Sequence, residues 1–336
     1  MRAAVIGGGA IGLKHLEALE TIDGLRACAV VELNLERGKA LASRFDLPVY
    51  TRLEEMLEAE KPDIAVIALP HHLHTAVALR CMESGCHLML EKPMANTVAE
   101  CSEIIAAAGR QGRVVMVGHT QHYLPENRAA RQLIAGTELG QLVMVNDVRH
   151  VPYFRDDRPD WFFERQMSGG GIIMNLGAHS IDKIQWLTGS RILSVKAALS
   201  YLGNRGDVEG SGMLMMELDG GAAASIVQSG YAGASRSETE LIYTGGMIRI
   251  VAGDGVYLSR GGPYGRVPAA ELEPPLVLQF RELLECLREG REPECSGEYS
   301  QSVIAVLESV YRSHISGKEE AVAVGTASIT AAGDGN

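Results

Sequence analysis

The feature that most constrains this chain is a glycine-rich turn close to its beginning. Residues 3–6 are apolar, residues 7–12 read GGGAIG, and helix-forming residues follow. A strand that breaks into G-x-G-x-x-G and continues as a helix is typical of a dinucleotide-binding unit. Gly7 would permit the tight turn, Gly9 the close approach of a pyrophosphate, and Gly12 the close packing of helix on strand. The sequence therefore predicts a dinucleotide site at the N-terminus of this helix.

A carboxylate at the end of the second apolar run indicates which dinucleotide is bound. Residues 27–31 are apolar and lead to Glu32, twenty residues after Gly12. A carboxylate at this position accepts hydrogen bonds from an adenosine ribose diol and repels a 2′-phosphate. NAD is therefore predicted over NADP. The nearby Arg37 could serve a 2′-phosphate, so NADP stays open as an alternative.

The composition predicts a soluble protein that acts on small molecules. The chain has 336 residues, of which 46% are hydrophobic, and this is enough material for two domains. A net charge of -11 argues against binding to nucleic acid or to a membrane through a polybasic face. No stretch is long and apolar enough to span a membrane, and the chain begins without a signal-peptide pattern, so we expect a cytoplasmic protein.

The cysteines and histidines do not indicate a metal or a disulfide framework. The six cysteines form no C-x-x-C pair and have no companion histidines at zinc-finger spacing. His71, His72 and His74 cluster just after a predicted strand, where polar loop residues are usual. No metal site is therefore predicted.

Residues 1–120 alternate short apolar runs with helix-period segments, which predicts an α/β domain with a doubly wound parallel sheet. We expect strands at 2–7, 27–32, 64–69, 87–91 and 113–118, and helices at 11–21, 34–44, 51–59, 73–84 and 97–110. The wholly apolar run 64–69 stops at the carboxyl edge of the sheet, where ligands bind in such folds. The next strand delivers Glu91 and Lys92 to the same edge.

After residue 120, helices are mixed with strand-like runs that are separated by turns rich in Gly and Asp. We expect helices at 125–135, 276–289 and 298–316, and strands at 142–151, 192–202, 212–218, 222–228, 238–244 and 247–251. The short turns predict an antiparallel sheet within an α+β domain. Apolar and small side chains between residues 212 and 228 indicate a sheet face that is buried against a second copy of the chain.

A helix-period segment at 172–187 carries a polar stripe and follows three consecutive glycines. Asn175, His179 and Asp182 are spaced i, i+4 and i+7, so they would share one face of the helix. A loop rich in arginine and aromatic residues precedes this segment, and such loops cover binding sites or oligomer contacts. The candidates for substrate contact in the loop are Tyr153, Arg155 and Trp161.

With these motifs assembled, the sequence resembles the glucose-fructose oxidoreductase and inositol dehydrogenase (Gfo/Idh/MocA) family to about residue 318. The motifs that carry the resemblance are the glycine turn, Glu91-Lys92-Pro93, Gly169-Gly170-Gly171, Gly177-x-His179-x-x-Asp182 and Arg288-Glu289-Gly290-Arg291-Glu292-Pro293. The resemblance implies a Rossmann domain joined to an α+β domain whose open, mainly antiparallel sheet often carries the oligomer interface. It also implies a homodimer or homotetramer that oxidises or reduces, with NAD(P), a secondary alcohol or ketone of a sugar, inositol or related polyol.

The resemblance assigns roles to two side chains and shows one departure. The family's lysine in the E-K-P turn corresponds to Lys92, and its site histidine corresponds to His179. The family usually has an aspartate four residues before that histidine, where this sequence has Asn175. A neutral amide does not stabilise an imidazolium as a carboxylate does, so any increase in the histidine pKa from that position should be lost. Asn175 could instead hydrogen-bond a substrate hydroxyl.

Hydride transfer leaves the protein with one proton to move. We expect His179 to accept this proton in the oxidation direction and Lys92 to hold the reacting oxygen. Lys92 could itself be the acid or base if burial and the cofactor's charge lower its pKa. Two rival functions stay open, namely a non-catalytic NAD(P)-binding sensor and a reductase of a non-sugar carbonyl.

The predicted organisation has three segments. They are an NAD-binding Rossmann domain at 1–120, a substrate-binding and oligomerisation domain at 121–318, and a C-terminal segment at 319–336 with a poorly ordered tail. The catalytic candidates are Lys92 and His179, and the substrate-binding candidates are Asn175, Asp182, Tyr153, Arg155 and Trp161. The cofactor-binding candidates are Gly7, Gly9, Ala10, Ile11, Gly12, Glu32, Leu69, Pro70, His71, His74, Glu91 and Lys92.

Overall fold

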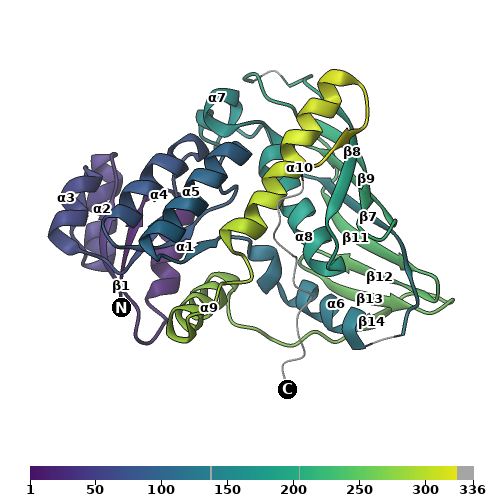
Figure 1. Ribbon diagram of the computed structural model, residues 1–336, viewed down its shortest axis with the longest axis horizontal. Coiled ribbons are helices and arrows are strands. Elements are labelled where there is room, and N and C mark those ends of the chain that lie inside the picture. The colour runs from purple at the N-terminus through teal and green to yellow at the C-terminus, as the bar shows by residue number, and fades with distance from the viewer. Residues whose placement is uncertain (137, 204, 324–336) are drawn as a thin grey trace. The chain divides into compact units, whose positions relative to one another are not determined.

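The computed structural model describes residues 1–136, 138–203 and 205–323 and is drawn as a ribbon in Figure 1. By its internal packing the chain divides into two units. Unit 1 comprises Met1–Thr120 and Glu273–Gln301, and unit 2 comprises Gln121–Leu272 together with the described residues from Ser302 onward. The division falls inside the last long helix, α10 (Gly297–Ser316).

Unit 1, all of whose residues are described, is built on a six-stranded parallel sheet in the order β3-β2-β1-β4-β5-β6. The strands are β1 (Arg2–Ile6), β2 (Arg26–Val31), β3 (Val49–Tyr50), β4 (Ile64–Ile67), β5 (His87–Leu90) and β6 (Val115–Val117). The helices between them are α1 (Ala10–Leu19), α2 (Leu35–Phe45), α3 (Leu53–Glu60), α4 (His74–Glu83) and α5 (Val98–Gln111). Every residue of β4 is buried and apolar, as in a strand with both faces covered. The predicted doubly wound parallel sheet is confirmed.

The strand order reverses between β1 and β4. From β1 the chain moves outward to β2 and β3, and it then returns to place β4 on the other side of β1. The carboxyl ends of parallel strands at such a reversal form the crevice in which ligands bind in open α/β folds. The segments that follow β1, β4 and β5 therefore share one edge of the sheet.

Residues 273–301 belong to unit 1, although the sequence suggested the second domain. They contain α9 (Pro275–Glu289) and the start of α10. Phe280 of α9 is fully buried, and its ring lies edge-on to His15 of α1 with 5.6 Å between ring centroids. A helix that is distant in sequence thus completes the core of unit 1, and sequence order alone does not indicate such a return.

Unit 2 contains a mixed sheet with the order β14-β13-β12-β11-β7-β10-β9-β8-β15 across its described residues. The strands are β7 (Leu142–His150), β8 (Ile192–Ser200), β9 (Ser211–Leu218), β10 (Ala223–Ser229), β11 (Arg236–Tyr243), β12 (Gly246–Val251), β13 (Gly255–Ser259), β14 (Gly265–Val267) and β15 (Glu320–Ala321). Neighbouring strands are antiparallel except for β7 and β10, which are parallel because the chain forms two other strands between them. The sheet is therefore mainly, not wholly, antiparallel.

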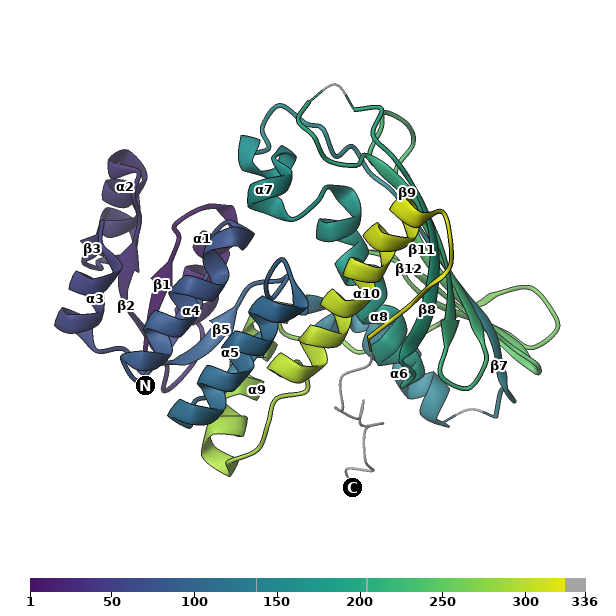
Figure 2. The ribbon, with the colours of Figure 1, turned by 45° about the horizontal axis from the view of Figure 1, so that its top comes forward.

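Helices cover one face of this sheet. They include α6 (Pro125–Gly136) and α8 (Ala178–Thr188), while the short α7 (Arg165–Ser168) lies in the connection before α8. Figure 2 shows α6 and α8 on the same side of the strands. On β9 the residues alternate strictly between buried and exposed or half-buried, and the outward series includes Met213 and Met215. In the described part of unit 2, the other face of the sheet is therefore open.

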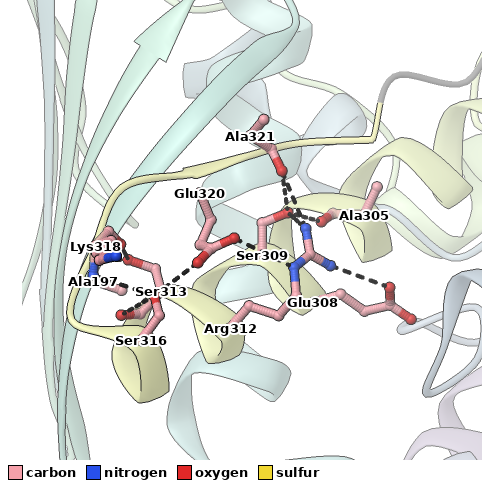
Figure 3. Close-up of polar contacts among 10 residues, drawn as sticks. All are labelled: Ala197, Ala305, Glu308, Ser309, Arg312, Ser313, Ser316, Lys318, Glu320 and Ala321. Atoms are coloured by element: carbon pink, nitrogen blue, oxygen red, sulfur yellow. Dashed lines mark hydrogen bonds and ion pairs between the residues drawn. The ribbon is translucent and has the colours of Figure 1, made fainter.

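The segment after α10 folds back onto β8. Glu320 and Ala321 form β15, which pairs with β8. Figure 3 shows the supporting contacts, in which Arg312 Nη2 donates to the Ala321 carbonyl oxygen at 3.1 Å and Ser316 donates to Glu320 at 2.7 Å. The prediction of a poorly ordered tail concerns residues 325–336, which lie outside the described residues.

Candidate functional site

The glycine turn joins β1 to α1 at the carboxyl edge of the unit 1 sheet. Gly7 has a φ of +100°, and a Cβ there would lie 2.3 Å from the Ala68 carbonyl oxygen. A Cβ on Gly12 would lie 1.8 Å from the Gly7 carbonyl oxygen, so a larger residue would push α1 off the turn. A Cβ on Gly9 would meet no atom nearer than the Arg37 guanidinium at 3.8 Å, which leaves this surface open to a ligand. The turn therefore fits a bound pyrophosphate.

Glu32 lies beside the same turn at the end of β2. Its carboxylate accepts hydrogen bonds from the backbone N–H of Gly8 at 3.0 Å and of Asn34 at 2.7 Å. Arg37 Nη1 lies 3.4 Å from this carboxylate. Glu32, which favours NAD, and Arg37, which could serve the 2′-phosphate of NADP, are thus paired with each other.

The loop after β4 lies at the same edge and is held there by the side chains of Leu69 and His74. Leu69 packs beside the turn, since its Cδ2 would lie 3.1 Å from a Cβ on Gly7. His74 is fully buried, with Nδ1 3.0 Å from the Pro93 carbonyl oxygen and Nε2 2.9 Å from the Leu69 carbonyl oxygen. Burial lowers the pKa of His74, although these carbonyl contacts act in the opposite direction. His74 therefore ties the loop after β4 to the loop after β5.

Glu91 and Lys92 follow β5 at the same edge. The Glu91 carboxylate is buried 2.8 Å from Nε2 of His15, which lies on α1 almost one turn beyond Gly12. Burial alone would raise the pKa of Glu91, but His15 and the charge of Lys92 hold it below its ordinary value. Glu91 thus braces the turn that carries Lys92 against the glycine helix. Lys92 itself is half-buried.

The other cofactor-binding candidates differ in exposure. Ala10 is exposed and Ile11 is half-buried at the first turn of α1, which carries no side-chain cap. The N–H groups of this turn are therefore available to a phosphate. Pro70 is half-buried, and His71 is almost fully buried with its ring 5.8 Å from that of His74.

In unit 2 the predicted polar stripe, formed by Asn175, His179 and Asp182, is divided between a π-helical turn and an α-helix. Asn175 belongs to a π-helical turn, Ile173–Gly177, and His179 and Asp182 belong to α8. The sequence predicted one continuous helix, and the wider first turn differs from that prediction; π-helical turns are frequent at functional sites. Asn175 is nearly buried and His179 is half-buried.

Asp182 is fully buried and bonded within unit 2. Its Oδ1 lies 2.7 Å from Nε2 of His122, which is also fully buried. The His122 ring stacks on Trp186 of α8 with 4.6 Å between ring centroids. The Asp182 carboxylate thus faces the interior of unit 2 and supports His122, and its predicted contact with substrate stays a prediction.

The loop before α8 brings Tyr153 next to Asn175. Tyr153 is fully buried, and burial raises its pKa to about 12, against opposing effects from Arg158 and from Asn175. Two predicted substrate residues from separate segments therefore meet. Sequence reasoning missed Arg158, because nothing in the sequence distinguishes it from Arg155.

The other two loop candidates, Arg155 and Trp161, form contacts with their own neighbours in the loop. The Arg155 side chain is 56% exposed and forms an ion pair with Asp157 at 3.1 Å, which satisfies its charge. Trp161 is half-buried and stacks on Phe162, with 3.8 Å between ring centroids. Neither of these contacts involves the polar stripe.

The helix that carries Asn175 and His179 is held in place by buried charged side chains. These side chains were not identified from the sequence. The Glu209 carboxylate accepts hydrogen bonds from the backbone N–H of Gly171 at 2.8 Å and of Ile173 at 2.9 Å, where a negative charge suits a helix N-terminus. Lys183 of α8 forms a buried ion pair with Asp147 of β7 at 2.7 Å. In the sequence, only the alternation of residues along the strand indicates that Asp147 is buried. Asp147 and Val145 are two residues apart on β7 and therefore point to the same, buried face.

Two further findings concern metals and membranes. Within residues 1–136, 138–203 and 205–323, no group of three or more His, Cys, Asp or Glu side chains is arranged to hold a metal ion. Among the helices of the same residues, none is long and apolar enough to cross a membrane.

Two family models match this chain in succession. Residues 1–119 match the model described as "Oxidoreductase family, NAD-binding Rossmann fold", and residues 127–249 match the "GFO/IDH/MocA C-terminal domain". The chain belongs to the Gfo/Idh/MocA family of oxidoreductases. Both the predicted resemblance and the predicted oxidoreductase class are confirmed.

Relatives in this family support the match along nearly the whole chain. The 4-carboxy-2-hydroxymuconate-6-semialdehyde dehydrogenase of Sphingobium sp. is 25% identical, over 88% of this chain and 93% of its own length. Inositol 2-dehydrogenase of Corynebacterium glutamicum is 26% identical, over 79% and 77%. Among solved structures, GenD2 from gentamicin A biosynthesis in complex with NAD is 27% identical with a TM-score of 0.85, over 96% of both chains. The aldose-aldose oxidoreductase from Caulobacter crescentus, complexed with glycerol, is 25% identical with a TM-score of 0.87, over 96% of this chain and 99% of its own.

Proposed function

We propose that this chain transfers a hydride between NAD and a secondary alcohol, or the matching ketone, of a sugar, inositol or related polyol. The observation that carries the proposal is the open surface at Gly9 beside the Glu32 carboxylate, within a turn that admits no other residue at Gly7 or Gly12. The relatives named inositol 2-dehydrogenase and aldose-aldose oxidoreductase support this substrate class.

We propose NAD as the preferred cofactor over NADP. Glu32 already accepts hydrogen bonds from the turn, so its carboxylate is held where an adenosine ribose would bind. A 2′-phosphate there would meet a negative charge. Arg37 offers limited compensation, because its guanidinium is engaged by the same carboxylate.

We propose that His179 and Lys92 carry out the proton chemistry. When bound, the nicotinamide supplies the hydride acceptor or donor. In the oxidation direction an imidazole nitrogen of His179 takes the hydroxyl proton, and Lys92 Nζ stabilises negative charge that develops on the oxygen. Glu91 and His15 position Lys92, since they fix the turn on which it lies. If Lys92 is instead the acid or base, its loss will change the pH profile of turnover as well as the rate.

We propose that Asn175, held near Tyr153, binds a substrate hydroxyl as donor and acceptor.

The presence of Asn175 also favours a second candidate function. Because the family usually has aspartate here, a chain with Asn175 could be a cofactor-binding sensor without turnover. A third candidate is reduction of a non-sugar carbonyl, and the relative named as a semialdehyde dehydrogenase supports it.

We propose that two or four copies assemble through the open sheet face of unit 2. Met213 and Met215 of β9 are both 63% exposed, and strand register places Met144 of β7 on the same face. An apolar face of this kind is costly in water, and a second copy could cover it. Light scattering at micromolar concentration should give a dimer or tetramer mass, and a monomer mass would contradict the proposal. A cytoplasmic location is supported by the six cysteines, which are all buried and none of which forms a disulfide.

One assay separates the three candidate functions. The protein is incubated with NAD and a panel of inositols, aldoses and sugar acids, while NADH absorbance is followed. NADH formation with at least one polyol or sugar is expected. If NADH binds tightly but no alcohol is oxidised and no sugar ketone is reduced, the polyol function is wrong. Reduction of semialdehydes with NADH would then indicate the third candidate, and its absence the sensor.

A further inference from the structure

Arg158 differs from two arginines near it, Arg155 in the same loop of unit 2 and Arg205 in the segment between β8 and β9. Arg155 is ion-paired with Asp157 at 3.1 Å, and Arg205 is ion-paired with Asp160 at 2.5 Å. Among the described residues, no carboxylate forms an ion pair with Arg158. Its Nε is buried and has no hydrogen-bond partner. A cation that is partly removed from water without a counter-charge is unfavourable, so this position favours an anion from outside the chain.

The surroundings of Arg158 hold its guanidinium in place. It lies 4.2 Å from the ring centroid of Tyr153 and 4.9 Å from that of Phe162, both within cation–π range. The backbone is fixed as well, because Arg205 donates hydrogen bonds to the carbonyl oxygens of Arg155 at 2.7 Å and Arg158 at 2.9 Å. A planar guanidinium fixed in this way is suited to bind a carboxylate.

A second polar group beside Arg158 also lacks a hydrogen bond of good geometry. The hydroxyl of Tyr153 is fully buried and has no hydrogen-bond partner of good geometry. This hydroxyl and the Arg158 side chain are close enough for each to shift the pKa of the other, and Asn175 acts on the same hydroxyl. Two groups that can donate, neither with a hydrogen bond of good geometry, thus lie beside Asn175, the residue that begins the polar stripe. A ligand oxygen that accepts from both would remove both deficits.

We infer that Arg158, with the hydroxyl of Tyr153, binds the carboxylate of an acidic substrate, so the preferred substrate is a sugar acid or a carboxylated polyol. This inference rests on the proposed function and names its substrate class. A carboxylate fits better than a phosphate, because one uncompensated cation matches one negative charge while Arg155 and Arg205 are already neutralised. The carboxylate would bind at this end of the stripe, and the reacting alcohol would lie toward His179.

The test is calorimetric titration of the protein–NADH complex with matched pairs of sugars. The probes are glucose and glucuronate, galactose and galacturonate, and glucose 6-phosphate. The wild type should bind the acid of at least one pair with a dissociation constant roughly tenfold or more below that of its neutral partner, as expected for a hydrogen bond to a charged group. Glucose 6-phosphate should bind no better than glucose.

Variants separate recognition from folding. Arg158→Gln should abolish the preference for the acid without changing the affinity for the neutral sugar, and Arg158→Lys should restore it in part. Arg44→Gln is the matched control, since Arg44 also lies over a ring, that of Phe45 at 4.9 Å, but is ion-paired with Glu17 at 2.6 Å. If Arg158→Gln fails to fold, Tyr153→Phe keeps the ring and should still weaken acid binding several-fold.

The outcomes of this test differ from those of the proposed function, because binding requires no turnover. Wild type that binds no acid, or binds acid and neutral sugar alike, overturns the inference. So does tighter binding of the phosphate than of the acids, or an equal loss of both sugars in Arg158→Gln. Acid binding that depends on Arg158 supports the inference even if the acid is never oxidised, and in that case only the proposed function fails.

Discussion

Unit 1 and unit 2 hold their candidate residues in different ways. In unit 1 the cofactor turn depends on backbone geometry, since Gly7 and Gly12 admit no Cβ and the strand order brings Lys92 to the same edge. In unit 2 the candidate site depends on side-chain packing, since Tyr153 from a loop meets Asn175 from a π-helical turn. Local spacing in the sequence thus defines the cofactor turn, whereas tertiary contacts assemble the proposed substrate site.

The largest effect should come from replacing the glycine that unit 1 needs for folding. Gly12→Ala places a Cβ 1.8 Å from the Gly7 carbonyl oxygen and should cost about 4 kcal/mol or more of unfolding free energy. Gly9→Ala places its Cβ in open space and should change stability by less than about 0.5 kcal/mol. Gly9→Ala should instead raise the NADH dissociation constant by roughly tenfold or more. Thermal melting and fluorescence titration measure these two effects, and equal melting curves for the two variants would contradict the backbone argument.

Unit 2 should be most sensitive at a buried side-chain pair. Lys183→Met leaves the Asp147 carboxylate buried without its cation and should cost about 3–5 kcal/mol. The matched control is Lys39→Met, because Lys39 is 74% exposed and its pair with Glu36 contributes little. Urea unfolding of the two variants checks the difference. Equal midpoints would show that unit 2 does not depend on this pair.

The same pair should make stability depend on acid pH. Burial alone would raise the pKa of Asp147, but the charge of Lys183 and the hydrogen bonds at the site hold it below its ordinary value. The unfolded chain therefore binds a proton at a pH where the folded chain does not, so this contribution is present above about pH 4 and is lost as pH falls below it. Urea midpoints of wild type between about pH 5 and pH 3 should fall more steeply than those of Lys183→Met.

Lys92 tests the catalytic side of unit 1. Lys92→Ala should lower kcat by roughly a hundredfold or more, because it removes a contact that is made to charge developing on the reacting oxygen. NADH binding should change little, since the glycine turn and Glu32 are untouched. Steady-state kinetics on the best substrate, with an NADH titration beside it, measures both. Wild-type turnover in this variant would exclude the assignment.

Cofactor choice should shift by a smaller amount. Glu32→Gln keeps an acceptor near the Gly8 N–H but removes the charge that opposes a 2′-phosphate. The ratio of the NADPH to the NADH dissociation constant should therefore fall by roughly tenfold. Glu36→Gln, on the exposed side of α2, is the control and should leave the ratio unchanged. A wild type that binds both cofactors equally would already contradict the prediction.

Most of the fold could be predicted from the sequence, because apolar periodicity is local. The strands and helices of unit 1 lie close to the predicted ranges apart from β3, which has only two residues. The return of α9 to unit 1 could not be predicted, because it depends on the contact of Phe280 with His15. The parallel pairing of β7 with β10 was missed for a similar reason, since turn signals report only on neighbouring strands.

The candidate site could be predicted only in part. The glycine turn and Glu32 were visible because their spacing is fixed by backbone geometry. Asp182 shares the helical spacing of His179, yet its carboxylate is buried against His122, and periodicity does not report a partner that is sixty residues away. Arg155 and Arg158 are equivalent in sequence, and only the contacts of their side chains distinguish them.

We propose that the substrate reacts at the polar face of unit 2 that carries Asn175 and His179. The most direct measurement is kcat/KM against pH for oxidation by wild type and by Asn175→Asp on the best substrate found. A carboxylate at this position would stabilise an imidazolium, so the acid limb of the profile should move to higher pH by roughly one unit. If the amide also binds substrate, KM should rise together with this shift. A profile and a KM that are both unchanged would show that residue 175 lies outside the reacting site and would contradict the account.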